Sequence, residues 1–290
     1  MSSIQQLRRR IRSTRDLVKV TRAMQAVSAS KVRRVQQQAV SSRPYYYWAK
    51  NFLKQLSSDA ELVQHIPWVR ETTPARRLLM VVLTSDRGLC GAYNQNVLRQ
   101  ALQFYEEHRG QQVEAFTIGR KGRDLLARAG VPIRHHADAP RSVPTYHEAQ
   151  RYARLIMEHF ALSAPEPYDE VYVIYTRFKN VLTQETQIER YLPIQLARAS
   201  AGQEFVYEPE KLTILEHFLP QMLTAELYHY MLESSASEHA ARMVAMENAS
   251  RNAEGLVQEL TLAYNKARQQ LITNELLDIA GGAEALQAIR

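Results

Sequence analysis

Apolar and small residues recur at alternating spacings of three and four near both ends of this chain. The N-terminal set is Ile4, Leu7, Ile11, Thr14, Val18, Thr21, Gln25, Ser28, Val32, Val35 and Ala39. The C-terminal set is Met243, Met246, Ser250, Ala253, Val257, Leu260, Tyr264, Ala267 and Leu271. This spacing marks one face of a helix, so it predicts two long helices with matching seams. Because the rest of the chain lies between them, the helices leave and return at one place, which favours an antiparallel coiled coil.

Glycine and proline support this division of the chain. Of the 21 such residues, 17 lie between Pro67 and Pro220, and residues 1–43 contain none. At about 1.5 Å per residue, the N-terminal helix would extend roughly 60 Å and the C-terminal helix roughly 90 Å. Helices of this length need a packing partner in water, and each is the other's nearest candidate. An open alternative places both helices on the surface of one large domain.

The middle of the chain alternates between strand-like and helix-like segments. The predicted strands are 78–83, 113–118, 171–175 and an edge strand at 183–191; the predicted helices are 92–108, one ending at Gly130, and 146–162. This order is typical of a small doubly wound α/β domain with a mostly parallel sheet. We therefore expect a helix in 1–66, an α/β domain in 67–210 and a second helix in 211–290. Arg43 before Pro44 predicts a kink or boundary, with aromatic residues 45–48 packing on the α/β domain.

The net charge of +7 is distributed unevenly. Residues 1–43 contain eleven basic residues and one acidic residue, whereas residues 221–290 contain five basic and nine acidic residues. The two predicted helices are therefore complementary in charge, with a surplus of positive charge on the first. That surplus indicates either a solvated helix face or an acidic protein partner. Nucleic acid is the other alternative, but no zinc-finger, RNP or helix-turn-helix signature is present.

The search for catalytic chemistry finds little. The turn from Thr84 to Gly91 follows a predicted strand, where α/β folds often bind phosphate, but it matches neither a P-loop nor a dinucleotide fingerprint. The segment Gly119 to Gly122 fails the same tests. Cys90 lies beside Arg87 and a helix start, so its pKa could be lowered, but no paired histidine makes it a nucleophile. The adjacent His135 and His136 point in different directions. We therefore expect no catalytic site, cofactor or metal.

Cysteine and hydropathy restrict the compartment. With Cys90 as its single cysteine, the chain can form no internal disulfide, and a reducing compartment is the default. No apolar run of 18 residues is long enough to span a bilayer. The arginine-rich N-terminal segment lacks the apolar core of a secretory signal. It resembles a mitochondrial transit peptide in charge, but it continues directly into the helical pattern, so we interpret it as part of the mature fold.

Three blocks carry a resemblance to a known family. The first is IRSTRDLVKVTRAMQAVSASKVRR at 11–34, the second is SDRGLCG at 85–91, and the third spans 237–284 and includes SEHAARMVAMENAS and LAYNKARQQLITNELLDIAGGAEAL. Together they resemble the γ-subunit family of F-type ATP synthase, the central rotor shaft. The resemblance implies an antiparallel coiled coil of the two terminal helices, and a Rossmann-like, mostly parallel α/β foot domain between them.

The resemblance also implies contact residues. It places Arg268, Gln269 and Thr273 against the catch loops of the β subunits. Facing an acidic lever segment of the β subunits it places Met24, Lys31, Arg33, Arg34, Arg87 and Cys90. At the foot, toward the ε subunit or the c-ring, it places Phe205, Val206, Tyr207 and Glu208. The small apolar residues 279–283 would form a low-grip tip inside the hexamer.

The implied assembly follows from the same family. One copy of the chain would enter an α3β3 hexamer and contact the ε subunit and the c-ring, with no nucleic acid, no cofactor and no catalysis of its own. It would lie at the cytoplasmic side of a bacterial inner membrane, as a peripheral protein attached only through the complex. The photosynthetic branch of the family carries an inserted segment with two cysteines; this chain has one cysteine and no comparable insertion, so we do not expect thiol control of that kind. Two alternatives stay open: an α/β enzyme, or a nucleic-acid-binding protein, with a coiled-coil arm.

Overall fold

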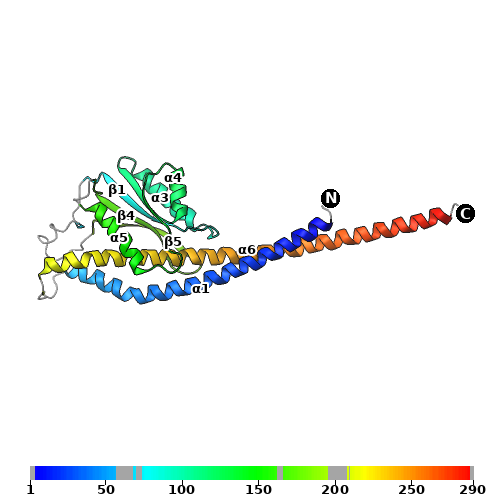
Figure 1. Cartoon of the computed structure of the whole chain (residues 1–290), viewed down its shortest axis with the longest axis horizontal. Coiled ribbons are helices and arrows are strands. Elements are labelled where there is room, and N and C mark those ends of the chain that lie inside the picture. The colour runs from blue at the N-terminus through cyan, green and yellow to red at the C-terminus, as the bar shows by residue number, and fades with distance from the viewer. Residues whose placement is uncertain are drawn as a thin grey trace. The chain divides into compact units, whose positions relative to one another are not determined.

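One long helix precedes a five-stranded sheet in the sequence and a second long helix follows it. The structure, a computed structural model, describes residues 4–56, 68–69, 74–161, 166–194, 208 and 210–287. The long helices are α1 (Ile4–Leu56) and α6 (Lys211–Gln287). Between them lie β1 (Arg77–Leu83), α3 (Tyr93–Glu107), β2 (Gln112–Ile118), α4 (Arg120–Arg128), β3 (Ile133–Ala137), α5 (Tyr146–Phe160), β4 (Glu170–Phe178) and β5 (Gln184–Leu192) (Figure 1). The predicted fold class is confirmed.

The contacts within the chain divide it into two compact units. One consists of Met1–Val27 together with Ala245–Arg290, and the other is Ser28–Val244. Both long helices therefore contribute to both units. The predicted division into 1–66, 67–210 and 211–290 consists of three continuous segments, whereas one of these units joins the two ends of the chain. The predicted division therefore stays a prediction.

The larger unit is a three-layer α/β structure. Its strand order is β3-β2-β1-β4-β5, with β5 antiparallel and the other pairs parallel. Helices α3 and α4 cover one face, around the alternating core residues Leu78, Met80 and Val82. The opposite face carries Leu79 and Val81 and packs on α5 and on the parts of α1 and α6 that belong to this unit (Figure 1). Since β1 is buried on both faces, its continuous apolar run is what a central parallel strand requires.

Strand β3 was not predicted. It contains Arg134, His135 and His136, and its side chains are only partly buried because it lies at the edge of the sheet. An edge strand this short and this polar lacks both the apolar run and the alternation that reveal strands in a sequence. The predicted edge strand at 183–191 is confirmed as β5.

A helix boundary at Arg43 is wrong, because α1 continues through Pro44 to Leu56. The other predicted outcome at this point, a kink, stays a prediction. Proline removes one backbone donor, but packing beyond it holds the helix together. Trp48 stacks on Phe52 with ring centroids 5.1 Å apart, and both rings meet Phe218 of α6 edge to face at 6.1 and 4.9 Å. Trp48 thus packs on α6, and burial of Leu53 extends the contact by a further turn. Packing of residues 45–48 on the predicted α/β domain stays a prediction.

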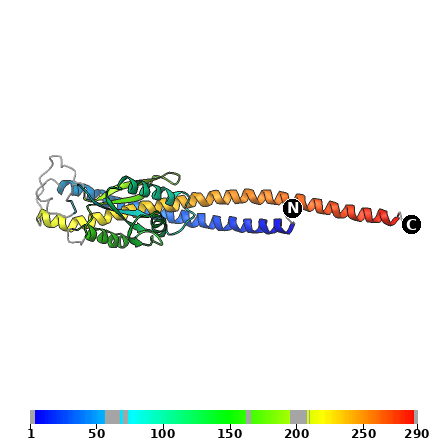
Figure 2. The same ribbon diagram turned by 90° about the horizontal axis from the view of Figure 1, so that it is seen from above.

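The smaller unit is a coiled coil of two antiparallel helices (Figure 2). Its buried residues are Leu7, Ile11, Thr21, Met246, Ser250 and Ala253. An ion pair joins the helices where Arg22 Nη2 lies 2.7 Å from Glu254 Oε1, in line with the predicted charge complementarity. Every predicted seam position from Ile4 to Ala39, and from Met243 to Ala267, is buried or half-buried. The predicted seams are therefore confirmed, apart from Leu271, which is exposed.

The last described part of α6 contributes no buried side chain. Every side chain from Arg268 to Gly281 is exposed, including Leu276, Leu277 and Ile279. Among the described helices, none is both long enough and apolar enough to cross a membrane.

Candidate functional site

The turn after β1, from Thr84 to Gly91, is fixed by a buried side chain of the following helix. Asn94 of α3 accepts a hydrogen bond from the Ser85 backbone N–H at 3.1 Å, and its Nδ2 atom lies 2.8 Å from Ser85 Oγ. The same amide donates to Cys90 Sγ at 3.2 Å, and Ser85 Oγ donates to the carbonyl of Arg87 at 2.6 Å. The inner polar groups of this turn therefore bond to one another rather than to a ligand.

Two glycines allow this loop to approach the neighbouring one. A Cβ atom on Gly119, where φ is +110°, would lie 2.3 Å from the Thr84 carbonyl oxygen, and one on Gly122 would lie 2.7 Å from Thr84 Oγ1. Thr84 Oγ1 instead accepts a hydrogen bond from the Gly122 N–H at 2.9 Å. Gly119 and Gly122, which match no nucleotide-binding motif, thus allow the loops that follow β1 and β2 to pack closely.

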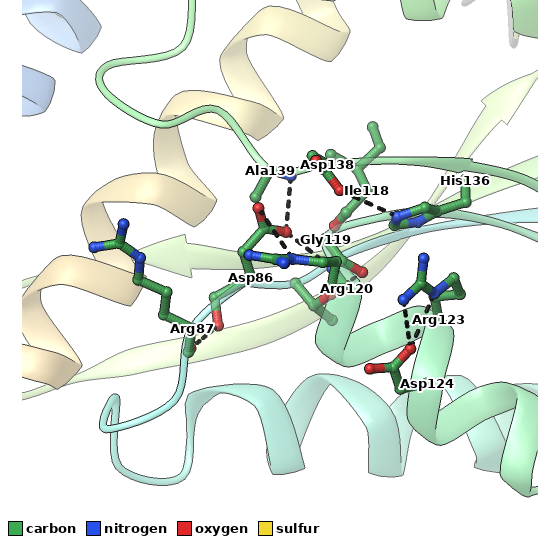
Figure 3. A network of polar contacts seen from close by, with 12 residues as sticks. Asp86, Arg87, Ile118, Gly119, Arg120, Arg123, Asp124, His136, Asp138 and Ala139 are labelled. Carbon is green, nitrogen blue, oxygen red and sulfur yellow. Dashed lines mark hydrogen bonds and ion pairs between the residues drawn. The ribbon is translucent and has the colours of Figure 1, made fainter.

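Asp86 links the loops at the carboxyl ends of the parallel strands β1, β2 and β3. Its Oδ1 atom accepts hydrogen bonds from the backbone N–H groups of Arg120 at 3.0 Å and Ala139 at 3.1 Å (Figure 3). Arg120 is the first residue of α4, whose N-terminal N–H groups lack partners within the helix and favour negative charge. The chain's own carboxylate therefore occupies the kind of helix terminus where a phosphate would bind in a nucleotide-binding α/β fold.

Arg242 of α6 holds the same loop from the other side. Its guanidinium donates to the carbonyl of Gly88 at 3.4 Å and to that of Arg87 at 3.5 Å. It also pairs with Glu238 Oε1 at 2.7 Å and donates to His239 Nδ1 at 3.1 Å. Both Arg242 and His239 are buried, with 8% and 7% of their surface exposed. A buried arginine needs several acceptors, and here the loop carbonyls supply what the single carboxylate cannot.

Burial sets the protonation of these groups. It lowers the pKa of His239 to about 3, with the Arg242 and Lys31 charges adding to the effect, so this imidazole is neutral and can accept from Arg242. Burial also raises the pKa of Glu238, and the neighbouring Arg242 opposes that rise. The pKa of the Cys90 thiol is raised by burial as well, so a lowered value beside Arg87 is wrong. Cys90 is an inert, buried thiol that supports the loop from within.

The outer side of the loop has a different character. Arg87 and Leu89 are exposed, and Leu89 adopts a left-handed backbone conformation with φ of +61°. Such a conformation is unfavourable for leucine and is maintained here by the hydrogen bonds within the loop. The loop therefore presents one cation and one apolar side chain on a fixed backbone, an arrangement that can bind a partner but has no catalytic group.

Comparison with known proteins identifies the family. A family model described as ATP synthase matches residues 3–286. An ATP synthase gamma chain from Geobacter sp. (strain M21) is 39% identical over 292 residues, with 99% of this chain and 100% of the relative covered. The chain belongs to the ATP synthase gamma-chain family. A second gamma chain, from Dehalococcoides mccartyi (strain CBDB1), is 38% identical over 288 residues, again covering 99% and 100%.

Solved structures show the same fold. A chain of the Euglena gracilis mitochondrial ATP synthase (OSCP/F1/c-ring) superposes with a TM-score of 0.70 at 23% identity, covering 99% of this chain and 95% of that one. A chain from the central stalk and c-ring of the Tetrahymena thermophila mitochondrial ATP synthase gives 0.60 at 25% identity, with 80% and 99% covered. The resemblance found in the sequence is thus confirmed, and the gamma chain is a non-catalytic subunit of its synthase.

The residues that the family resemblance singled out fall at different places in this gamma chain. In the smaller unit, Arg268, Gln269 and Thr273 lie on the exposed part of α6, where Thr273 Oγ1 donates to the Gln269 carbonyl at 2.9 Å, and Met24 is half-buried on α1. In the larger unit, Arg33, Arg34 and Arg87 are exposed and Lys31 is half-buried. Glu208 is exposed, whereas Phe205, Val206 and Tyr207 lie outside the described residues.

Sequence reasoning missed Asp86, Glu238 and Arg242 as site residues of this gamma chain. Glu238 and Arg242 stand four residues apart, which indicates a helical ion pair but gives no sign that it is buried. Arg242 reaches carbonyl groups 154 and 155 residues away in the sequence, and a backbone carbonyl has no residue-type signature. Only the fold brings these groups together.

Proposed function

We propose that this chain is the central rotor stalk of an F-type ATP synthase, which couples ion-driven rotation of a c-ring to conformational changes in the catalytic β subunits. The observation that carries the proposal is family membership over the full length, at 39% identity to an ATP synthase gamma chain. The alternatives, an enzyme or a nucleic-acid-binding protein with a coiled-coil arm, have no support from the comparisons.

The coiled coil suits a shaft. Two helices packed along a common seam resist bending and twisting better than a single helix, because each constrains the other's side chains. Rotation can drive conformational change only if the shaft interacts differently with each state of its partners.

The exposed end of α6 supports insertion into a hexamer of α and β subunits. An isolated helix is marginal in water, and exposed leucines favour a partner surface. From Arg268 to Gly281 the helix has no buried side chain, yet it carries Leu276, Leu277 and Ile279 with 62%, 64% and 69% of their surface exposed. We place Arg268, Gln269 and Thr273 against the β-subunit catch loops in this part of the helix.

The basic residues support contact with an acidic segment of the β subunits. Arg33 and Arg34 are exposed cations on helix α1, which also carries Met24 and Lys31. Arg87 is an exposed cation in the turn after β1, and Cys90 lies in the same turn. Cys90 has 2% of its surface exposed, so its role in such a contact is to hold the backbone of the loop. At the foot, Phe205, Tyr207 and Glu208 would face the ε subunit or the c-ring. One copy per complex would lie at the cytoplasmic side of a bacterial inner membrane.

Reconstitution tests the rotor assignment. The full chain is mixed with the α and β subunits of the same synthase, and the complex is weighed by native mass spectrometry. We expect one copy per three αβ pairs, and ATP-driven rotation of a probe attached to this chain. A hexamer that excludes the chain would overturn the proposal. So would ATP hydrolysis by the purified chain alone, which we expect neither to hydrolyse ATP nor to bind it in calorimetry.

A further inference from the structure

We infer that Asp86, Lys31 and Arg242 form a joint that fixes both long helices to the loops at the carboxyl ends of the parallel strands and sets the torsional stiffness of the rotor. The inference rests on the proposed rotor function. It assigns to these residues a positioning role, because they transmit load between the sheet and the helices. These groups come from helices α1 and α6 and from the loops after β1 and β3, and all of them lie in the unit Ser28–Val244.

Helix α6 is attached to two neighbouring strands through one buried polar face. Glu233 accepts a hydrogen bond from the Phe178 N–H at 2.8 Å, Ser234 Oγ accepts from the Thr176 N–H at 3.1 Å, and Ser237 Oγ donates to the Thr176 carbonyl at 3.1 Å. These contacts hold the end of β4. One turn further along, Arg242 holds the loop that follows β1, the strand paired with β4. Successive turns of α6 are thus attached to adjacent strand ends.

Helix α1 is attached to a second loop at the carboxyl ends of the same parallel strands. Lys31 Nζ donates to the carbonyl of Arg141 at 3.2 Å, in the loop that follows β3. That loop is tied to the first one by Asp86, which accepts from Ala139 in the second loop and from Arg120 at the start of α4 (Figure 3). A path of hydrogen bonds therefore runs from α1 through Lys31, the two loops and Asp86 to Arg242 on α6.

Polar contacts suit this task better than apolar ones. Hydrogen bonds and ion pairs fix direction as well as distance, whereas the hydrophobic effect that holds apolar surfaces together is non-directional. A buried ion pair contributes little net stability compared with apolar residues of similar volume, because desolvation offsets the attraction. The pair of Glu238 and Arg242 should therefore matter more for the rigidity of the attachment than for the stability of the fold.

This difference gives a test that separates stiffness from stability. The double variant Glu238→Leu with Arg242→Met replaces the buried pair by apolar side chains of similar size. In the reconstituted complex, we expect retained ATP hydrolysis and only a small fall in the thermal midpoint, because the buried His239 Nδ1 loses its donor. The variance of the angle of a probe fixed to the sheet domain, with the exposed end of α6 held in the hexamer, should rise at least twofold. Proton pumping per ATP should fall.

The matched control is Glu247→Leu with Arg251→Met, an ion pair of the same spacing on the same helix, with side chains 46% and 67% exposed. It should leave the variance unchanged. Equal variance in both double variants and the wild type would overturn the joint, as would equal softening by both. If the first variant does not assemble, Arg242→Lys keeps the charge but loses the planar fork, and should still soften the rotor. Wild-type stiffness in that variant would overturn the joint, whereas a wild-type chain that never rotates would overturn the rotor assignment itself.

Discussion

At the scale of single residues, Gly119 shows how steric demand fixes a loop. Alanine at this position would place Cβ 2.3 Å from the Thr84 carbonyl oxygen, on a backbone with φ of +110°. Both effects are unfavourable, so we expect Gly119→Ala to lower the free energy of unfolding by about 3 kcal/mol or more. Urea denaturation of the full chain measures the loss. Gly110→Ala is the control, because a Cβ there meets no atom within 4 Å, and an equal loss in both variants would contradict the steric explanation.

His239 makes stability sensitive to acid. Its pKa is about 3 in the fold, against an ordinary value of 6.5, because burial disfavours the imidazolium. The unfolded chain therefore binds a proton more readily, so the stabilising contribution is complete above pH 6.5 and is lost as the pH falls toward 3. One such group contributes a slope of at most about 1.4 kcal/mol per pH unit. We expect urea midpoints of His239→Gln to fall less steeply than those of the wild type between pH 6.5 and 4, and parallel curves would contradict this.

At the scale of elements, Gly255 is a weak point in α6. Glycine inside a helix costs about 0.5–1 kcal/mol relative to alanine, because it loses more backbone freedom on folding. A Cβ at Gly255 meets nothing within 4 Å, so no steric penalty opposes the gain. We expect Gly255→Ala to raise the free energy of unfolding by about that amount, measured by urea denaturation with circular dichroism. A loss of stability would show instead that the coiled coil needs the glycine.

The same scale shows what the sequence can reveal about this fold. The seams of α1 and α6 were predictable because periodic burial against one partner leaves a periodic pattern of residue types. Strands β1, β2 and β4 were predictable because burial on both faces demands apolar runs. The end of α1 was not, because the ring contacts of Trp48 and Phe52 with Phe218 that sustain it beyond Pro44 depend on tertiary packing. Asp86 and Arg242 bind backbone groups of distant loops, and such contacts leave no pattern to detect.

At the scale of the whole molecule, coupling and stability should separate at the exposed end of α6. The side chains of Arg268 and Gln269 are exposed and pack on nothing else in the described part of the chain. Truncating them removes no internal burial, so the effect on stability should be within about 0.5 kcal/mol. If these side chains touch the catch loops of the β subunits, their loss should instead weaken the dependence of β conformation on rotor angle. We therefore expect Arg268→Ala with Gln269→Ala to reduce proton pumping per ATP.

The matched control lies on the same helix in the same unit. Asn265→Ala with Lys266→Ala removes an exposed polar residue and a cation one turn before the proposed contact. It should leave both coupling and stability near their wild-type values. Proton pumping and ATP hydrolysis in reconstituted vesicles measure coupling, and thermal unfolding of the full chain measures stability. Unchanged pumping and hydrolysis together with a large loss of helix stability would contradict the contact, since they would make Arg268 and Gln269 part of the shaft's own structure.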